Sequence, residues 1–141
     1  MKKFKFSLEK VLSLREFEEK QAQIELGKAQ SVVNDINEQL KFIASERVKS
    51  NESRSKSSDL TFLMSIENYI NGLDYKKELL IQELTKAQII LEEKRAIVIE
   101  AIKKRKSLEK LKEKQFESYK KEYNKEEEKI LDEISSSKFS K

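Results

Sequence analysis

The chain has 141 residues, and its composition excludes most globular architectures. Charged residues make up 40% of the sequence and hydrophobic residues 37%, and 30 basic against 26 acidic residues give a net charge of +4. Two glycines and no proline cannot supply the turns of an α/β or all-β domain, because turns need residues that adopt special backbone angles. A composition of this kind is typical of long helices or coiled coil.

The residue types also limit the chemistry. The sequence has no Cys and no His, which excludes disulfides, thiol chemistry, the usual metal centres and imidazole bases. Carboxylates cluster at Glu18-Glu19, Glu92-Glu93 and Glu126–Glu128, at helical surface spacing among lysines, as solvated helix faces do. Gly27 and Gly72 are isolated, so no phosphate-binding loop is present. We therefore expect no catalytic residue, no cofactor and no metal, and hence no enzyme.

Membrane segments are not expected either. The longest apolar runs, such as Ala96-Ile97-Val98-Ile99, are far shorter than the ~20 residues of a membrane span. The basic start of the chain is not followed by the apolar stretch of a secretory signal. These features predict a cytoplasmic protein that does not insert into a membrane.

The first predicted helix covers about residues 5–48. Its apolar residues follow a 4-3 spacing, which keeps one seam facing a partner helix. The seam consists of Leu8, Leu12, Arg15, Glu19, Ala22, Leu26, Ala29, Val33, Ile36, Leu40 and Ile43. Residues 49–59 contain no apolar side chain and five serines, and we interpret them as a hinge with Ser58 or Asp59 as the next N-cap.

The second predicted helix covers about residues 60–134, and residues 135–141 are expected to fray. Its seam consists of Ile66, Ile70, Leu73, Lys77, Leu80, Leu84, Ala87, Leu91, Lys94, Val98, Ala101, Arg105 and Leu108. Asn71-Gly72 is a strong turn dipeptide in other contexts. Because the seam passes through it without a change of phase, we predict that the helix continues.

The two seams predict an all-α fold: a single coiled-coil domain over residues 1–141, folded as an antiparallel two-helix hairpin that is monomeric in isolation. A hinge near residue 54 would pair positions whose numbers add to about 108, so that Leu8 lies opposite residue 100 in a rod about 60 Å long. Residues beyond about 105 would then form an overhanging C-terminal helix. The alternative is a parallel dimer of one continuous helix.

Two stretches are candidates for binding partners. The basic cluster Lys103–Lys106 could bind phosphates, but no aromatic residue is interleaved with it and acidic residues flank it, which favours an acidic protein surface over nucleic acid. The N-terminus is dense in apolar residues from Phe4 to Leu14. This stripe could cap the coiled coil near residue 100 or enter a partner, and spacing alone does not separate the two.

The sequence resembles the FliJ family of bacterial flagellar type III export. The resemblance rests on the opening Phe4-Lys-Phe6-Ser-Leu8-Glu-Lys-Val11-Leu12-Ser-Leu-Arg15 and on Lys106-Ser-Leu-Glu-Lys-Leu-Lys-Glu-Lys114, Tyr119 and Leu131-Asp-Glu133. It extends over essentially the whole chain. Without this resemblance, the alternative is a generic cytoplasmic coiled-coil scaffold or adaptor.

The resemblance implies a hairpin similar to the central stalk subunit of rotary ATPases. Its end with the termini would enter the pore of the hexameric export ATPase, its hinge end would face the cytoplasmic domain of the export gate, and it would escort export chaperones. It would associate with the flagellar basal body at the inner membrane through these partners. The expected ATPase-facing residues are Phe4, Phe6, Leu8, Val11, Arg15, Lys103, Lys104, Arg105 and Lys106. The expected gate-facing residues are Gln39, Ile43, Tyr69 and Leu73.

Overall fold

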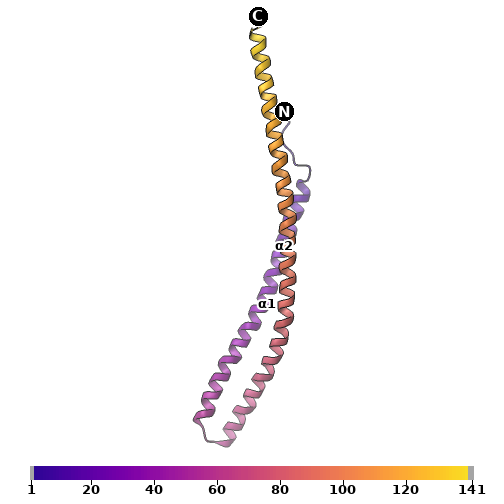
Figure 1. The fold of residues 1–141 in the computed structure, drawn as a ribbon. Helices are drawn as coiled ribbons and strands as arrows, with labels where there is room; N and C mark the ends of the chain where they lie inside the picture. Colours follow the sequence, from indigo (N-terminus) through magenta and orange to yellow (C-terminus); the bar gives the residue numbers. More distant parts are fainter. Residues whose placement is uncertain (1, 140–141) are drawn as a thin grey trace. The chain divides into compact units, whose positions relative to one another are not determined.

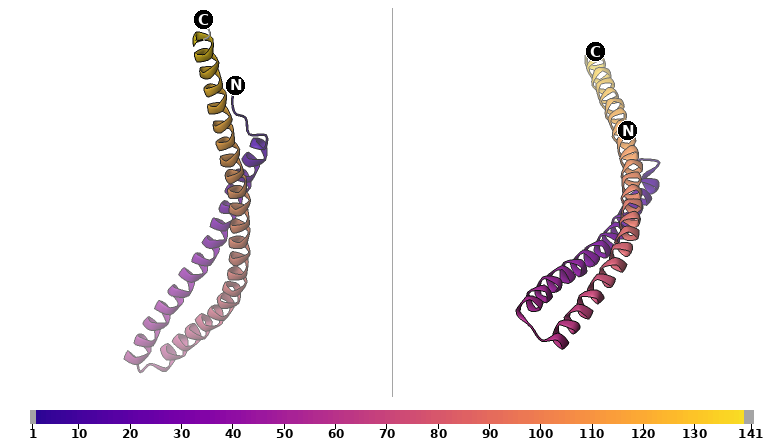
Figure 2. Two further views of the ribbon diagram at one scale, coloured as in Figure 1. Left: turned by 45° about the horizontal axis from the view of Figure 1, so that its top comes forward. Right: turned by 60° about the horizontal axis from the view of Figure 1, so that its bottom comes forward.

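The computed structural model describes residues 2–139 and contains two long helices (Figure 1). Helix α1 covers Glu9–Lys56 and helix α2 covers Leu60–Phe139, and residues 57–59 join them. No strand occurs in this described range. Further views show the helices joined at one end as a hairpin (Figure 2), so the predicted all-α hairpin is confirmed.

Contacts group the chain into two units, of which one is Ala22–Val98. Its core is a single row of buried side chains from the facing sides of α1 and α2. The row consists of Ala29, Val33, Ile36, Ile43, Leu73, Leu80, Ala87 and Leu91, each at most 8% exposed. All of these are predicted seam positions, so the 4-3 spacing located the core of this unit correctly.

The predicted hinge over residues 49–59 is wrong, because α1 continues to Lys56. Polar residues occupy the next seam positions after Ile43 and keep its spacing. Arg47 forms an ion pair with Asp74 at 3.0 Å, Arg54 forms one with Glu67 at 2.7 Å, and Ser50 between them is buried. On the α1 side the helix pair therefore continues with polar residues, through cross-helix ion pairs and a small buried hydroxyl, while α2 still contributes the buried Ile66 and Ile70.

Helix α2 starts at a polar cap. The Asp59 carboxylate accepts a hydrogen bond from the Thr61 backbone N–H at 3.1 Å, which confirms Asp59 as the N-cap. The helix passes through Asn71-Gly72, where Gly72 has no positive φ, so the predicted continuation is also confirmed. It extends to Phe139, five residues beyond the predicted end at residue 134, while residues 140 and 141 lie outside the described residues.

The other unit contains residues 1–21 and 99–141. Residues 2–8 are not helical, so α1 begins at Glu9 rather than near residue 5, and the Leu8 carbonyl accepts the first helical hydrogen bond from Leu12. Glu9 forms an ion pair with Lys112 at 2.9 Å. The predicted register, with Leu8 opposite residue 100, is therefore wrong by roughly three and a half helical turns.

The cause of the register error is the position of the turn. Facing residues in this pair, and in the Arg47–Asp74 and Arg54–Glu67 pairs, have numbers that add to 121 instead of the expected 108. The overhang is shorter as a result, because side chains are uniformly exposed only from residue 120 to residue 138.

Candidate functional site

The N-terminal segment folds back onto α2 through an aromatic cluster. The Phe4 ring lies 5.2 Å from the Phe116 ring and 5.5 Å from the Tyr119 ring, measured between centroids. Edge and tilted ring contacts of this kind add to the stability that burial provides. Phe6, two residues on, is only 7% exposed. The apolar N-terminal stripe thus caps the helix pair, at Phe116 and Tyr119 rather than near residue 100.

Arg105 is the one member of the expected basic cluster that is tied into the helix pair. Its guanidinium donates hydrogen bonds to the Glu19 carboxylate on α1 and to both carboxylate oxygens of Glu109 at 2.9 Å. Hydrogen bonds to Glu109 and then to Glu19 raise the pKa of Arg105, against a smaller opposing effect of burial. This side chain fixes the position of α1 on α2 and is not free for a partner.

The other three basic residues of the cluster remain available. Lys103, Lys104 and Lys106 are exposed, and none forms an ion pair with another residue in the described part of the chain. The cluster therefore presents three free positive charges on α2 beside a paired guanidinium. We had expected this cluster in the overhang, but it lies within the paired part of the unit.

The remaining residues expected to face the ATPase are partly accessible. Leu8 and Val11 are each 36% exposed. Arg15 is half-buried and forms an ion pair with Glu18 at 3.0 Å within α1. The structure thus places Phe4 against α2, buries Phe6, leaves Leu8 and Val11 at the surface, and pairs Arg15 with a neighbour on its own helix.

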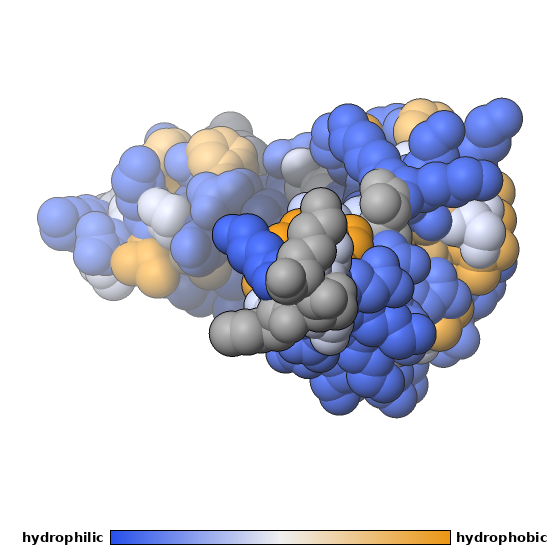
Figure 3. Space-filling view, turned by 90° about the horizontal axis from the view of Figure 1, so that it is seen from above, coloured by the Kyte–Doolittle hydropathy of each residue, from blue (hydrophilic) through white to orange (hydrophobic). Residues whose placement is uncertain are grey.

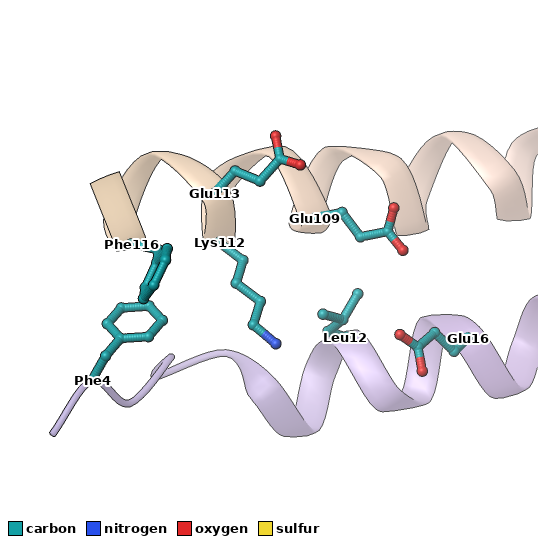
Figure 4. Close-up of a pocket in the computed structure, with 7 residues that line it drawn as sticks. All are labelled: Phe4, Leu12, Glu16, Glu109, Lys112, Glu113 and Phe116. Atoms are coloured by element: carbon teal, nitrogen blue, oxygen red, sulfur yellow. The ribbon is translucent and has the colours of Figure 1, made fainter. Parts of the chain in front are cut away.

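A groove of about 490 Å³ runs between α1 and α2 next to the aromatic cluster (Figure 4). Figure 4 shows the rings of Phe4 and Phe116 at one end, with Leu12 projecting from α1 toward α2. The charged lining residues are Glu16, Glu109, Lys112 and Glu113. Sequence reasoning did not find this groove, because it depends on the register of the two helices.

The four residues expected to face the export gate fall into two groups. Ile43 is 3% exposed and Leu73 is 7% exposed, and both belong to the core of the Ala22–Val98 unit. Gln39 and Tyr69 are exposed. The Tyr69 hydroxyl donates a hydrogen bond to the Glu46 carboxylate at 3.0 Å, and this bond raises the pKa of Tyr69 with smaller contributions from burial and from the charge of Glu46. Only Gln39 and Tyr69 are placed to contact a partner directly.

The Ala22–Val98 unit also carries apolar side chains outside the seam. A shallow, mostly apolar groove on its side is lined by Ala29, Val32, Ile36, Ala87 and Ile90, with Glu83 and Lys86 at its edges. Val32 is 51% exposed and Ile90 is 47% exposed. Exposed apolar groups that adjoin one another are typical of interaction surfaces. The signal in the sequence was the occurrence of apolar residues next to the seam, which a two-helix interface does not require.

The face of the molecule in Figure 3 is mainly hydrophilic, with hydrophobic residues in small groups between the hydrophilic ones. The described residues contain no group of three or more His, Cys, Asp or Glu that could hold a metal ion. Within residues 2–139, neither helix has a stretch apolar enough to cross a membrane.

These features define an all-helical coiled-coil hairpin. The family model described as "Flagellar FliJ protein" matches residues 4–141. The chain therefore belongs to the FliJ family, and it has a role related to flagellar export. No curated protein and no solved structure matches it.

Proposed function

We propose that the chain is a non-enzymatic stalk of the flagellar export apparatus. It binds the hexameric export ATPase through the unit that contains residues 1–21 and 99–141, and it contacts the cytoplasmic domain of the export gate through the Ala22–Val98 unit. It also escorts export chaperones. In this proposal it is a cytoplasmic monomer that reaches the basal body through its partners and binds no nucleic acid.

The observation that carries the ATPase contact is the set of three exposed lysines, Lys103, Lys104 and Lys106, which have no ion-pair partner in the described chain. Exposed charges of one sign on one helix attract a complementary surface and orient the encounter. Leu8 and Val11 add accessible apolar area to the same unit. An acidic surface with an apolar patch, as expected at the ATPase pore, is complementary to these residues.

The proposed mechanism is a bias on the states of the ATPase subunits. A protein without catalytic residues changes the rate of an ATPase only if it binds the enzyme's states with different affinities. A hairpin of two unlike helices presents a different side chain set in each direction, so in a six-fold ring it contacts each subunit differently. It therefore favours different states at different subunits.

The test is the ATPase rate of the purified export ATPase with and without the chain. We expect the Lys103→Gln/Lys104→Gln/Lys106→Gln variant to stimulate less than the unaltered chain at low salt, with the difference shrinking as salt rises. The matched control is Lys76→Gln/Lys77→Gln/Lys86→Gln, which removes the same charge from exposed positions of the other unit. Equal stimulation by both variants at low salt would overturn the proposed contact.

The apolar contribution needs a separate variant. Phe6 is buried and Phe4 holds the N-terminal segment, so their removal would disturb the fold of the unit as well as any contact. Leu8→Ser/Val11→Ser removes exposed apolar surface instead. We expect it to weaken stimulation by an amount that does not depend on salt, since burial of apolar groups is not screened by ions.

The gate contact is tested by binding to the purified cytoplasmic domain of the gate. Gln39→Ala and Tyr69→Ala should weaken binding while circular dichroism stays unchanged, because both side chains are exposed. If neither variant changes the affinity, this surface is not the gate contact. Deletion of the gene tests the whole proposal, since normal motility and filament assembly in the deletion strain would contradict it.

A further inference from the structure

The groove between α1 and α2 in the unit of residues 1–21 and 99–141 has an apolar floor and uncompensated acidic walls. Phe4, Leu12 and Phe116 provide the apolar lining (Figure 4). Its volume of about 490 Å³ falls in the usual range of ligand pockets, about 300–1,000 Å³. A pocket of this size takes more than one large side chain.

The charges on the walls are not balanced by the protein itself. Lys112, the only basic residue among the described residues that line the groove, is already paired with Glu9 at 2.9 Å. Glu109 is engaged by Arg105. Glu16 and Glu113 form no ion pair with any other residue among those described, and both are exposed. The groove therefore has two free carboxylates among its lining residues: Glu16 on α1, and Glu113 on α2, whose side chain is turned away from α1 and lies at the outer edge (Figure 4).

The walls are two helices whose lining residues repeat at helical spacing. Leu12 and Glu16 are four residues apart on α1, and Glu109, Glu113 and Phe116 lie at intervals of four and three on α2. A groove between two helices with such rows accepts an amphipathic helix, which places side chains at intervals of three and four residues into it.

We propose that this groove binds a basic amphipathic helix of a partner protein. Large apolar side chains of that helix enter the space beside Phe4, Leu12 and Phe116, and Lys or Arg residues on its flanks pair with Glu16 and Glu113. The charge of the occupant follows from the two free carboxylates, because an acidic or neutral helix would leave them desolvated without a partner. The proposal does not depend on the ATPase contact, since the groove is complete in the chain alone.

The first experiment measures fluorescence anisotropy of a labelled peptide with two heptads of the pattern Leu-Lys-Lys-Leu-Leu-Lys-Leu, titrated with the full chain. We expect saturable binding that weakens roughly three- to tenfold in the Glu16→Gln/Glu113→Gln variant, as the loss of two exposed ion pairs predicts. The control Glu117→Gln/Glu122→Gln changes the net charge equally at exposed positions outside the groove. Equal weakening by both variants would mean that the basic peptide is attracted by the net charge of the chain and not bound at the groove, and this would overturn the proposal.

The second experiment locates the peptide. A photoreactive leucine in the peptide should cross-link to residues 12–16 and 109–116, and cross-links spread along both helices would contradict the proposal. The same peptide with Glu in place of every Lys should not bind, and its binding would show that the carboxylates do not select the occupant. If the chain instead self-associates and Glu16→Gln/Glu113→Gln abolishes this, the occupant is a second copy and the proposal is wrong.

Discussion

A substitution at Leu73 tests whether this residue, which was expected to face the export gate, instead stabilises the helix pair. Its side chain is 7% exposed in the core of the Ala22–Val98 unit. Leu73→Ala removes three carbon groups, each of which contributes about 0.8 kcal/mol when buried. A pair of helices has no deep interior, so water and neighbouring side chains fill the space and the added cost of a cavity is small. We therefore expect a loss of about 2 kcal/mol, at the low end of the usual ~2–5 kcal/mol.

The assay is urea unfolding followed by far-ultraviolet circular dichroism. Gln39→Ala is the control, because Gln39 is exposed and surface substitutions usually change stability by less than about 0.5 kcal/mol. If Leu73→Ala costs no more than Gln39→Ala, the burial argument is refuted and Leu73 is available for a partner. If the expected difference is found, weaker gate binding by Leu73 variants reflects a damaged hairpin rather than a lost contact.

Three further predictions concern the unit around the turn. Gly72→Ala should raise the free energy of unfolding by up to about 1 kcal/mol in the same assay, because Gly72 is helical and an added Cβ meets no atom within 4 Å; a loss of stability would contradict the helical geometry. Asp59→Ala should lower it by about 1 kcal/mol through loss of the cap on Thr61, while Asp59→Asn should retain most of it. The raised pKa of Tyr69 means that its bond to Glu46 stabilises the fold fully below the pKa of free tyrosine, near 10, and that this contribution is lost as the pH rises through the higher value in the folded chain. Ultraviolet titration of tyrosine ionisation in the unaltered chain and in Tyr69→Phe checks this. The tyrosine that is missing from the curve of the variant should be one that ionises above the usual pKa. If the missing tyrosine ionises at or below the usual pKa, the prediction is contradicted.

The core could be predicted from the sequence because an apolar 4-3 repeat has one geometric consequence, a seam between two helices. The same repeat already indicated that Ile43 and Leu73 are buried and that Arg105 faces α1, since all three stand on predicted seam positions. Ile43 and Leu73 were assigned to a partner surface from the family resemblance instead, and Arg105 because it belongs to the basic cluster. The structure agrees with the seam: Ile43 and Leu73 are buried, and Arg105 bonds to Glu19 on α1.

The turn could not be located from apolar residues. Arg47, Ser50 and Arg54 continue the spacing with polar side chains, and their stability in the helix pair depends on Asp74 and Glu67 across the interface. Such cross-helix pairs become visible only once the register is known. Because the turn was predicted too early in the chain, the predicted register was wrong. The predicted overhang and the predicted place of the basic cluster were therefore also wrong, and the groove could not be found.

The register of α1 on α2 is the central claim, because the pairing of Arg105 with Glu19 and the groove both depend on it. The chain has no cysteine, so spin labels can be attached at chosen positions, and electron paramagnetic resonance measures the distance between them. The account predicts a short distance for Glu9→Cys/Lys112→Cys and, for Glu9→Cys/Glu100→Cys, a distance that reflects a further separation of about 18 Å along α2. A shorter distance for the pair at residues 9 and 100 would contradict it and restore the register in which the basic cluster overhangs.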